Sequence, residues 1–490
     1  MRIIYIVLVV ILSLESCGKL SDLNINPNQP SEVNMDNILP GVLRDLSNTM
    51  VTQSYLIGNN AAQLTAKSLR VEVDIYNWGS FDTWTSLFDI LRNVYNLEDI
   101  AKEDGNQSYE AVAIILRSYI FSVLTDAYSD IPYMEAVTGN RLDNFKPIYD
   151  SQEYIYTGTD GLLAALQRAN DLLTNTNSSI SGDILYNNNL DKWKRFGNSL
   201  RLRLLLHISK KINVSTQMSE ILSTSGSIME SNSDNAALNY LDAFPNQYPI
   251  IALKTGDFDA VRIGESLVSS LKKTKDPRLG QYARPTDATI NQKDSLEYLG
   301  WTNGADGCDT DGSRLGLAYY DYPNHPLATN KAQAVFMSYS EVQFIIAEAI
   351  QQGWVSGDAA SYYKRGIENS ITYHDADLED FGWTDFNDFY NNSGVAYNGT
   401  QTQLWEQKWV ALFFHGLEPY FEVRRWLNIQ NNNWSSLGFL VAPCNNNNND
   451  LLPSRFLYPS EEKELNGENY NTASSNIGGD NINSKMWSIQ

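Results

Sequence analysis

The sequence predicts a mainly α-helical protein, built from about four helical hairpins and a large, irregular, loop-rich lobe. The first observation is that apolar residues recur at helical spacing in paired segments. These segments lie near residues 83–124, 160–208, 339–371 and 403–427. The second observation is that long stretches rich in Asn, Asp, Ser, Gly and Tyr separate and follow the pairs. They span residues 215–335, 372–400 and 430–490. Loops of this length are uncommon in compact domains unless they carry function, so we expect a rigid helical scaffold that supports a binding lobe.

The N-terminal residues predict a cleaved signal peptide and a lipid anchor. Residues 3–12 form an unbroken apolar and aromatic stretch that is too short to span a membrane. It is followed by Leu14-Glu-Ser-Cys17, which is similar to the lipobox of a bacterial lipoprotein precursor, although Glu15 stands where a small or apolar residue is usual. We expect residues 1–16 to be removed and Cys17 to be acylated, because two or three acyl chains hold a protein stably to a bilayer. The alternative is an ordinary secretory signal with an incidental cysteine.

The next segment predicts a tether. Residues 17–40 are polar and rich in Asn and Pro, as in Leu23-Asn-Ile-Asn-Pro-Asn-Gln-Pro30, and they show no periodicity. We expect this lipidated tether to lead into a single domain that spans residues 41–490.

Apolar stripes predict the first two hairpins. In the first pair, one helix carries the stripe Trp84, Leu87, Phe88, Leu91 and Tyr95. The mostly apolar run 111–124 predicts its buried partner. In the second pair, the two stripes are Leu162, Leu166, Ala169 and Leu173, and then Trp193, Phe196, Leu200, Leu204 and Ile208. Each stripe places its apolar side chains on one face, so each helix is expected to pack on its partner.

Start and stop signals predict the last two hairpins. Ser338 and Glu341 form a capping box that opens a helix, Gly353 is a stop, and residues 359–371 supply the partner. In the fourth pair, His415-Gly416 separates a helix that carries Trp405 and Trp409 from a second helix that begins at Glu418-Pro419. No regular period of about 34 residues connects the pairs, which favours a divergent array over a regular solenoid.

Short motifs follow one another along the chain. They are Leu23-Asn-Ile-Asn-Pro-Asn28, Tyr128-Ser-Asp-Ile-Pro-Tyr133-Met-Glu-Ala136, Trp193-Lys-Arg-Phe-Gly-Asn-Ser-Leu-Arg-Leu-Arg203, Asp276-Pro-Arg-Leu279, Tyr339-Ser-Glu-Val342, Gln407-Lys-Trp409, Glu422-Val-Arg-Arg425 and Tyr458-Pro-Ser-Glu461. In this order they resemble the SusD/RagB family of nutrient-binding outer-membrane lipoproteins, and within it the SusD-like branch. The second motif is similar to the family's GDIPYSEA loop, with Ser129 where the family often has Gly.

The resemblance implies a fold, a function and a location. It implies tetratricopeptide-like helical hairpins capped by loops, in a protein that is lipid-anchored to the outer membrane and faces the cell exterior. Such a protein captures a nutrient, most often a glycan or oligosaccharide, and delivers it to a SusC-type TonB-dependent transporter. It binds its ligand and is not an enzyme. The alternatives are a surface glycoside hydrolase or a peptide-binding member of the same family.

Aromatic and polar residues in the predicted loops, including the loop before the first hairpin, are the candidates for a ligand site. A sugar offers apolar ring faces and many hydroxyls, so its site needs flat aromatic rings together with polar side chains. The candidate residues that combine these properties are Tyr76, Trp78, Trp301, Asn303, Tyr320, Tyr322, Asn324 and Trp434. Aromatic residues in loops also fasten loops to a core, and packing is therefore the alternative role for each of them.

The charge and the chemical motifs narrow the remaining functions. The net charge of −22 and the absence of a basic run argue against a nucleic-acid partner. The four histidines belong to no catalytic or zinc-binding motif, and we expect no cofactor.

Asp306, Asp309 and Asp311 have an acidic spacing that could bind calcium, although they lack the downstream Glu of an EF-hand, and a solvated turn is the simpler interpretation. Cys308 and Cys444 could form a disulfide or remain thiols.

Overall fold

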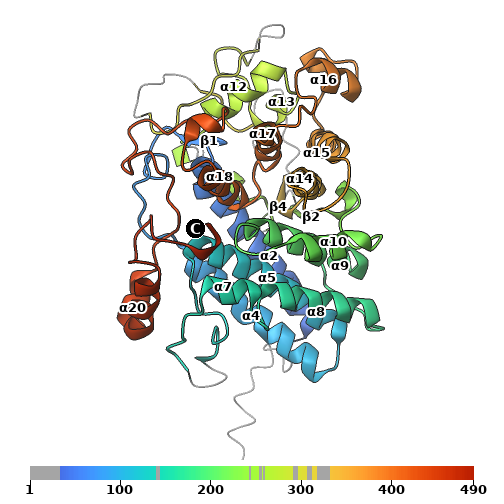
Figure 1. Ribbon diagram of the computed structural model, residues 1–490, viewed down its shortest axis with the longest axis vertical. Coiled ribbons are helices and arrows are strands. Elements are labelled where there is room, and N and C mark those ends of the chain that lie inside the picture. The colour runs from blue at the N-terminus through green and yellow to red at the C-terminus, as the bar shows by residue number, and fades with distance from the viewer. Residues whose placement is uncertain are drawn as a thin grey trace, which may run out of the picture.

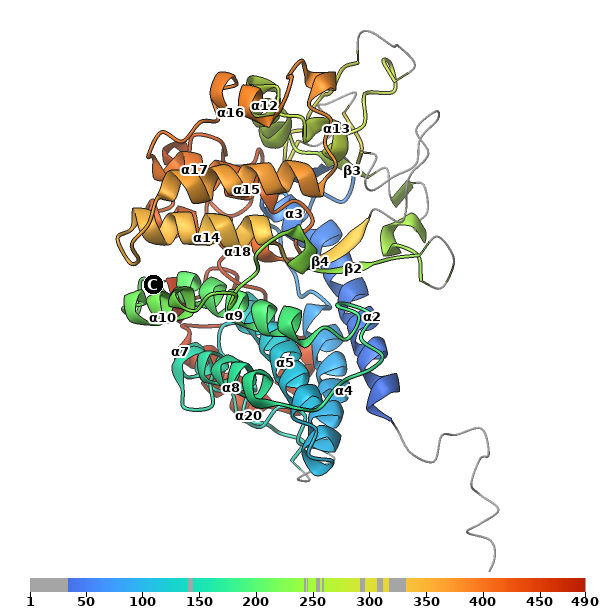
Figure 2. The same cartoon turned by 90° about the vertical axis from the view of Figure 1, so that its right-hand side faces the viewer.

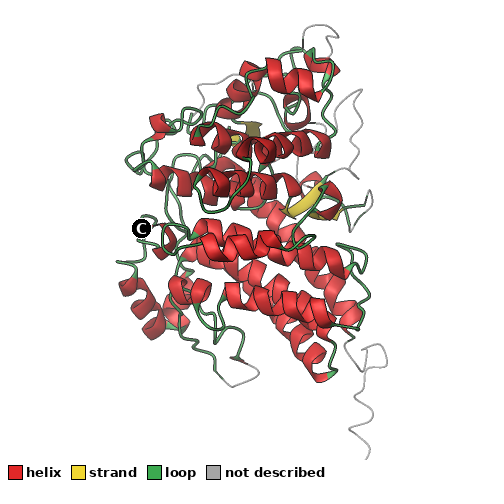
Figure 3. Cartoon of the chain, turned by 45° about the vertical axis from the view of Figure 1, so that its right-hand side comes forward, coloured by secondary structure: helices red, strands yellow, loops and turns green. Residues whose placement is uncertain are grey.

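Helices stack in layers along the long axis of the molecule (Figures 1 and 2). The computed structural model describes residues 34–489, apart from 140–143, 242–243, 245, 253–255, 258–259, 291–295, 306–311 and 317–331. Helices dominate the described residues, and the strands are few and short (Figure 3). The predicted class, a mainly α-helical array of hairpins, is therefore confirmed.

The first two hairpins form one half of the stack. Helix α4 (Thr83–Glu103) pairs with α5 (Gln107–Tyr128), and α8 (Leu162–Asn175) precedes α9 (Leu190–His207). Because α5 packs against α4, α8 and α9, nearly all of its side chains are buried. By length and composition α5 could cross a membrane, but 94% of its apolar window is buried inside the fold. It is the central core helix that the sequence predicts.

The other two hairpins form the second half. Helix α14 (Tyr339–Gln351) pairs with α15 (Ala359–Tyr373), and α17 (Gln401–Ala411) precedes α18 (Glu418–Ile429). Ser338 caps α14 by accepting a hydrogen bond from the Glu341 backbone N–H, as the capping box predicts. Helix α9 packs against α14 and joins the two halves, as Figure 2 shows.

One long helix lies where the sequence predicted the end of the tether. Helix α2 (Met35–Gln53) begins after Asn34, whose side chain accepts a hydrogen bond from the Asp36 backbone N–H. The tether therefore ends before Met35 and not at Pro40. Pro40 lies inside α2, where its missing N–H removes one helical hydrogen bond. The buried stripe that includes Leu39, Leu43, Leu46 and Met50 packs α2 against α4 and outweighs that loss.

The stretches predicted as irregular contain short helices and lie in more than one place. The shorter α-helices of the described chain are α3 (Asn59–Ala61), α7 (Gln152–Thr157), α10 (Ser215–Ser223), α12 (Glu265–Thr274), α13 (Leu279–Tyr282), α16 (Phe386–Asn392), α19 (Ser460–Leu465) and α20 (Gly467–Asn476). A π-helical turn, Ser54–Gly58, joins α2 to α3. Helices α12, α13 and α16 lie together at one end, whereas α20 lies near the opposite end (Figures 1 and 2).

Two small antiparallel sheets connect distant segments. Strand β1 (Thr65–Lys67) pairs with β3 (Val261–Ile263), with Ala66 opposite Arg262. Strand β2 (Ala236–Asn239) pairs with β4 (Gln333–Met337), with a register shift between Ala236 and Ala237. Both sheets fasten parts of the middle stretch to the helical scaffold.

Candidate functional site

Five of the predicted ligand-binding residues lie buried in the described structure. Tyr76, Trp78, Trp301, Asn303 and Trp434 are only 2–7% exposed. The Trp78 indole packs edge-on against the rings of Tyr420 and Phe456, at 5.4 and 5.6 Å between centroids. Trp434 donates its indole N–H to the Asp450 carbonyl, at 2.6 Å. In this conformation these rings offer no open face for stacking on a sugar, so the prediction is corrected in favour of the alternative role, packing.

The same residues hold three loops together. The Asn303 amide donates to the Thr65 carbonyl at 2.9 Å, and the Cys444 backbone N–H donates to the Asn303 carbonyl at 3.0 Å. Beside them, the buried carboxyl of Asp74 accepts a hydrogen bond from the Lys67 backbone N–H. Burial raises the pKa of Asp74 to about 7. These contacts make a loop junction and not a ligand platform.

The remaining predicted residues lie outside the described part of the chain. They are the acylation site Cys17, the ligand candidates Tyr320, Tyr322 and Asn324, the calcium candidates Asp306, Asp309 and Asp311, and the possible disulfide partner Cys308. Cys444, the other possible partner, is exposed.

A buried network of ion pairs joins the two halves of the helical stack. Arg425 on α18 makes two hydrogen bonds of 2.9 Å to Glu348 on α14. It also binds Glu422, which accepts a hydrogen bond from Lys408 on α17 at 2.8 Å. Arg203 on α9 binds Glu341 on α14 through two contacts of 2.6 Å. All of these side chains are buried, so each charge depends on its partner.

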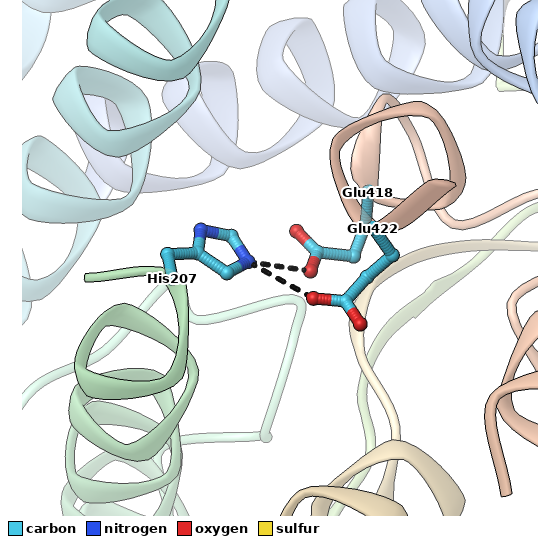
Figure 4. A group of neighbouring side chains, drawn as sticks. All are labelled: His207, Glu418 and Glu422. Atoms are coloured by element: carbon cyan, nitrogen blue, oxygen red, sulfur yellow. Dashed lines mark hydrogen bonds and ion pairs between the residues drawn. The ribbon is translucent and has the colours of Figure 1, made fainter. Parts of the chain in front are cut away.

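His207 joins this network through Glu418 and Glu422 (Figure 4). Its Nδ1 lies 2.9 Å from Asp126, and its Nε2 lies 2.9 Å from Glu418 and 3.6 Å from Glu422. Burial alone lowers the pKa of an imidazole, but Glu418 and Asp126 outweigh it and raise the pKa of His207 to about 10. Conversely, burial alone would raise the pKa of Glu418, but Arg203 and His207 lower it to about 2. The imidazolium is therefore the stable form at neutral pH.

This cluster resembles a metal site in composition but not in chemistry. One ligand atom from each of His207, Glu418 and Glu422 lies within 4.8 Å of the others. A metal needs the neutral imidazole, whereas His207 is held protonated. Lys408 and Arg425 already neutralise Glu422, so a further cation would meet like charges. The residues do not fit a metal ion.

The same cluster does not fit a catalytic site either. A base with a pKa of about 10 is already protonated at neutral pH. The cavity beside it, lined by Arg203, His207, His415 and Glu418 among others, has a volume of about 10 Å³. Such a cavity holds about one water molecule and leaves no room for a substrate. The network therefore connects packed helices and offers no site for a substrate.

Two adjoining hollows follow the solvent side of α4. The first, of about 370 Å³, lies between α4, α5, α8 and the segment after α5; its lining includes Tyr95, Glu98, Lys102, Arg117 and Arg168. The second, of about 530 Å³, lies between α4 and residues 135–139 and 144–147; its described lining includes Arg92, Asn96, Glu135, Asn144 and Phe145. Tyr95 and Asp99 line both hollows. We call the pair the α4 groove.

The floor of the α4 groove is held by charged side chains. Glu98 is buried and accepts hydrogen bonds from Lys102 at 2.6 Å and from Arg117 at 2.9 Å. The Arg117 guanidinium lies 5.5 Å from the centroid of the Tyr95 ring, a cation–π contact that fixes both groups. At the rim, the Tyr133 hydroxyl donates to the Asp160 carbonyl at 2.7 Å. The groove is thus preorganised and polar.

Part of this groove corresponds to a pattern in the sequence. Periodicity predicts Tyr95 on the apolar stripe of its helix, but the side chain is only half-buried, and Asp99 and Lys102 follow it at helical spacing. A polar stripe beside an aromatic residue on a long helix marks such a surface. The opposite wall comes from α8 and the segment after α5, and sequence spacing alone does not bring those residues together.

The described fold is an array of helical hairpins with a polar groove along α4. The family described as starch-binding and associating with the outer membrane matches residues 27–459. The chain therefore belongs to the SusD-like family, as its motifs indicate, and members of this family are binding proteins and not enzymes. No curated protein matches the sequence.

Solved structures share the fold over nearly the whole chain. An outer-membrane protein of Bacteroides vulgatus, titled as involved in nutrient binding, is 26% identical with a TM-score of 0.77; the match covers 94% of this chain and 100% of that one. A SusD homologue of Bacteroides fragilis is 25% identical with a TM-score of 0.76 and the same coverage. A chitin-binding protein is 25% identical with a TM-score of 0.74, over 93% of this chain and 100% of its own. These likenesses support the tetratricopeptide-like array.

Proposed function

We propose that this chain is a cell-surface lipoprotein that captures a glycan and delivers it to a SusC-type TonB-dependent transporter in the outer membrane. The observation that carries the proposal is the family match across residues 27–459. The chitin-binding relative supports a saccharide ligand, since the same fold carries that activity. The mechanism is binding without chemistry: the ligand is held by hydrogen bonds and ring contacts, and is then passed to the transporter.

The proposed anchor is the thiol of Cys17. Replacing Cys17 with alanine is expected to release the protein from the outer membrane. The thiol that would carry the acyl chains is then missing, and those chains are the proposed anchor. Fractionation of cells that express the wild type and Cys17→Ala measures this directly. A matched control is Cys444→Ala, which should stay in the membrane fraction. Retention of Cys17→Ala in that fraction would show that the anchor is elsewhere.

The proposed ligand and partner are tested together. The full-length protein, purified in mild detergent from its native membrane, is expected to bring down a large outer-membrane β-barrel protein. The same preparation is expected to bind neutral oligosaccharides on a glycan and peptide array, without releasing new reducing ends. Binding to peptides alone would identify the ligand as a peptide and not a glycan. Turnover of an oligosaccharide would favour the alternative function, a glycoside hydrolase.

A further inference from the structure

Asp74 is a buried acidic residue of the loop junction that the proposed function does not use. It is 1% exposed, and its carboxyl accepts a hydrogen bond of 2.8 Å from the Lys67 backbone N–H. A carboxylate can accept about four hydrogen bonds. Among the described residues, however, the second carboxyl oxygen of Asp74 has no hydrogen-bond partner. The ionised form is therefore poorly compensated, whereas a protonated carboxyl loses less on burial.

The groups around Asp74 do not compensate for its burial. The charged and titratable ones are Lys67 on β1, Arg262 on β3, Arg70, Glu72 and Tyr76 in the segment of Asp74, Cys444 and Asp450 in residues 441–450, and Tyr420 on α18. The Lys67 ammonium, the Gly304 N–H and the Asn303 amide favour the ionised carboxyl. Burial outweighs all three and holds the pKa of Asp74 at about 7.

Asp74 lies where segments distant in sequence meet. Strand β1 binds its carboxyl directly. The next residue, Ile75, accepts a hydrogen bond of 2.7 Å from the Asn447 backbone N–H. Asn303 connects β1 to the Cys444 backbone from the other side. A change in the charge of Asp74 therefore acts on contacts that hold residues 65–76 to residues 441–447.

Backbone strain favours opening of the same junction. Gln63 and Tyr76, which lie on either side of β1 and Asp74, have left-handed backbone conformations with φ of 59° and 58°. Such conformations cost free energy in residues other than glycine and persist only where contacts hold them. The Gln63 amide donates to the Val441 carbonyl at 2.5 Å, which is one such contact. Opening the junction would release this strain.

We propose that Asp74 is a pH-sensitive switch of the loop junction. While the carboxyl carries a proton, the junction stays closed. When the carboxyl ionises, its burial becomes unfavourable, so opening that brings water to the carboxylate becomes easier. Opening would release residues 65–76 from residues 441–447. The switch is a property of the junction and does not rest on the proposed glycan ligand.

Linkage gives the direction of the effect. The closed junction holds the proton with a pKa of about 7, against 3.8 for an unperturbed aspartate. The proton therefore stabilises the closed junction fully below about pH 4, and this contribution is lost as the pH rises to about 7. Between pH 5 and pH 7 the equilibrium constant for opening should rise by about ten- to fiftyfold, and it should level off above that range.

Hydrogen exchange of the full-length protein between pH 5 and pH 8 tests the switch. After correction for the intrinsic pH dependence of exchange, peptides that contain the Lys67 and Asn447 amides should lose protection by the stated factor. Asp74→Asn keeps the shape of the side chain but has no titrating proton, so its protection should stay level. The matched control is Glu72→Gln, which removes an exposed carboxyl from the same segment and should follow the wild type.

Infrared difference spectra between the same pH limits give a second measurement. The wild type should lose a protonated-carboxyl C=O band that Asp74→Asn lacks. Level protection in the wild type would overturn the proposal, and so would an equal loss in Asp74→Asn. If Asp74→Asn does not fold, the wild-type exchange profile decides: a loss that levels off near pH 7 supports the switch, and a level profile overturns it. Glycan binding is measured separately, so failure of the switch leaves the proposed function intact.

Discussion

Replacing Arg425 with alanine is expected to lower the free energy of unfolding by about 3–5 kcal/mol. The side chain is buried and makes four hydrogen bonds, two to Glu348 and two to Glu422. Its removal leaves the buried Glu348 carboxylate without its cation. Among the described residues, the Trp405 indole N–H then remains as its hydrogen-bond donor. Urea denaturation followed by circular dichroism measures the change.

Two further variants separate this effect from the general cost of losing an arginine. Arg44→Ala removes an exposed pair with Asp45 and is expected to cost less than about 1 kcal/mol. The double variant Arg425→Met with Glu348→Leu removes both buried charges and should be more stable than Arg425→Ala, because it leaves no unpaired carboxylate on α14. Equal losses for Arg425→Ala and Arg44→Ala would mean that the buried pair contributes no more than an exposed one.

Raising the pH above neutrality is expected to destabilise the protein through His207. Its pKa is about 10 in the folded state, against 6.5 for an unperturbed histidine. The folded state therefore binds the proton more tightly, so its contribution is fully present below about pH 6.5 and is lost as the pH rises to about 10. The steepest loss approaches ~1.4 kcal/mol per pH unit. Urea denaturation between these limits measures it.

The variant His207→Gln isolates this contribution from other groups that titrate in the same range. Glutamine keeps a hydrogen-bonding side chain but has no titrating proton. We expect His207→Gln to be less stable than the wild type at pH 6, where it leaves Asp126 and Glu418 without their shared cation. The difference should shrink toward pH 10. Parallel stability curves for the two proteins would show that His207 does not carry the proton.

Helix periodicity was enough to locate the hairpins but not to predict the residue at which the tether ends. The stripes that begin at Trp84 and Leu162 correspond to α4 and α8, because a core face of 3.6-residue period is encoded locally. Helix α2 carries an equally clear buried stripe, but Pro40 and the polar residues before it favoured an extended chain. Tertiary packing against α4 decided the outcome, and such packing is not visible in a local window.

The site was harder to predict than the fold, for two different physical reasons. Trp78 and Trp434 are in loops, as expected, but a loop aromatic can turn inward, and its direction depends on partners such as Tyr420 that are distant in sequence. The ion network has the same difficulty: Arg425 and Glu348 are 77 residues apart. Opposite charges on separate helices become partners only once the hairpins are stacked.

The crosswise ion pairs also constrain how the molecule can move. Arg203 and Glu341 connect α9 to α14, and Arg425 and Glu348 connect α18 to α14, so bending one hairpin against the next would strip buried charges of their counterions. In a regular solenoid each repeat contacts only its neighbours, so ion pairs of this kind between distant hairpins are missing. We expect the helices of this array to move together as one rigid body. Any hinge used during ligand delivery is therefore expected outside these four helices.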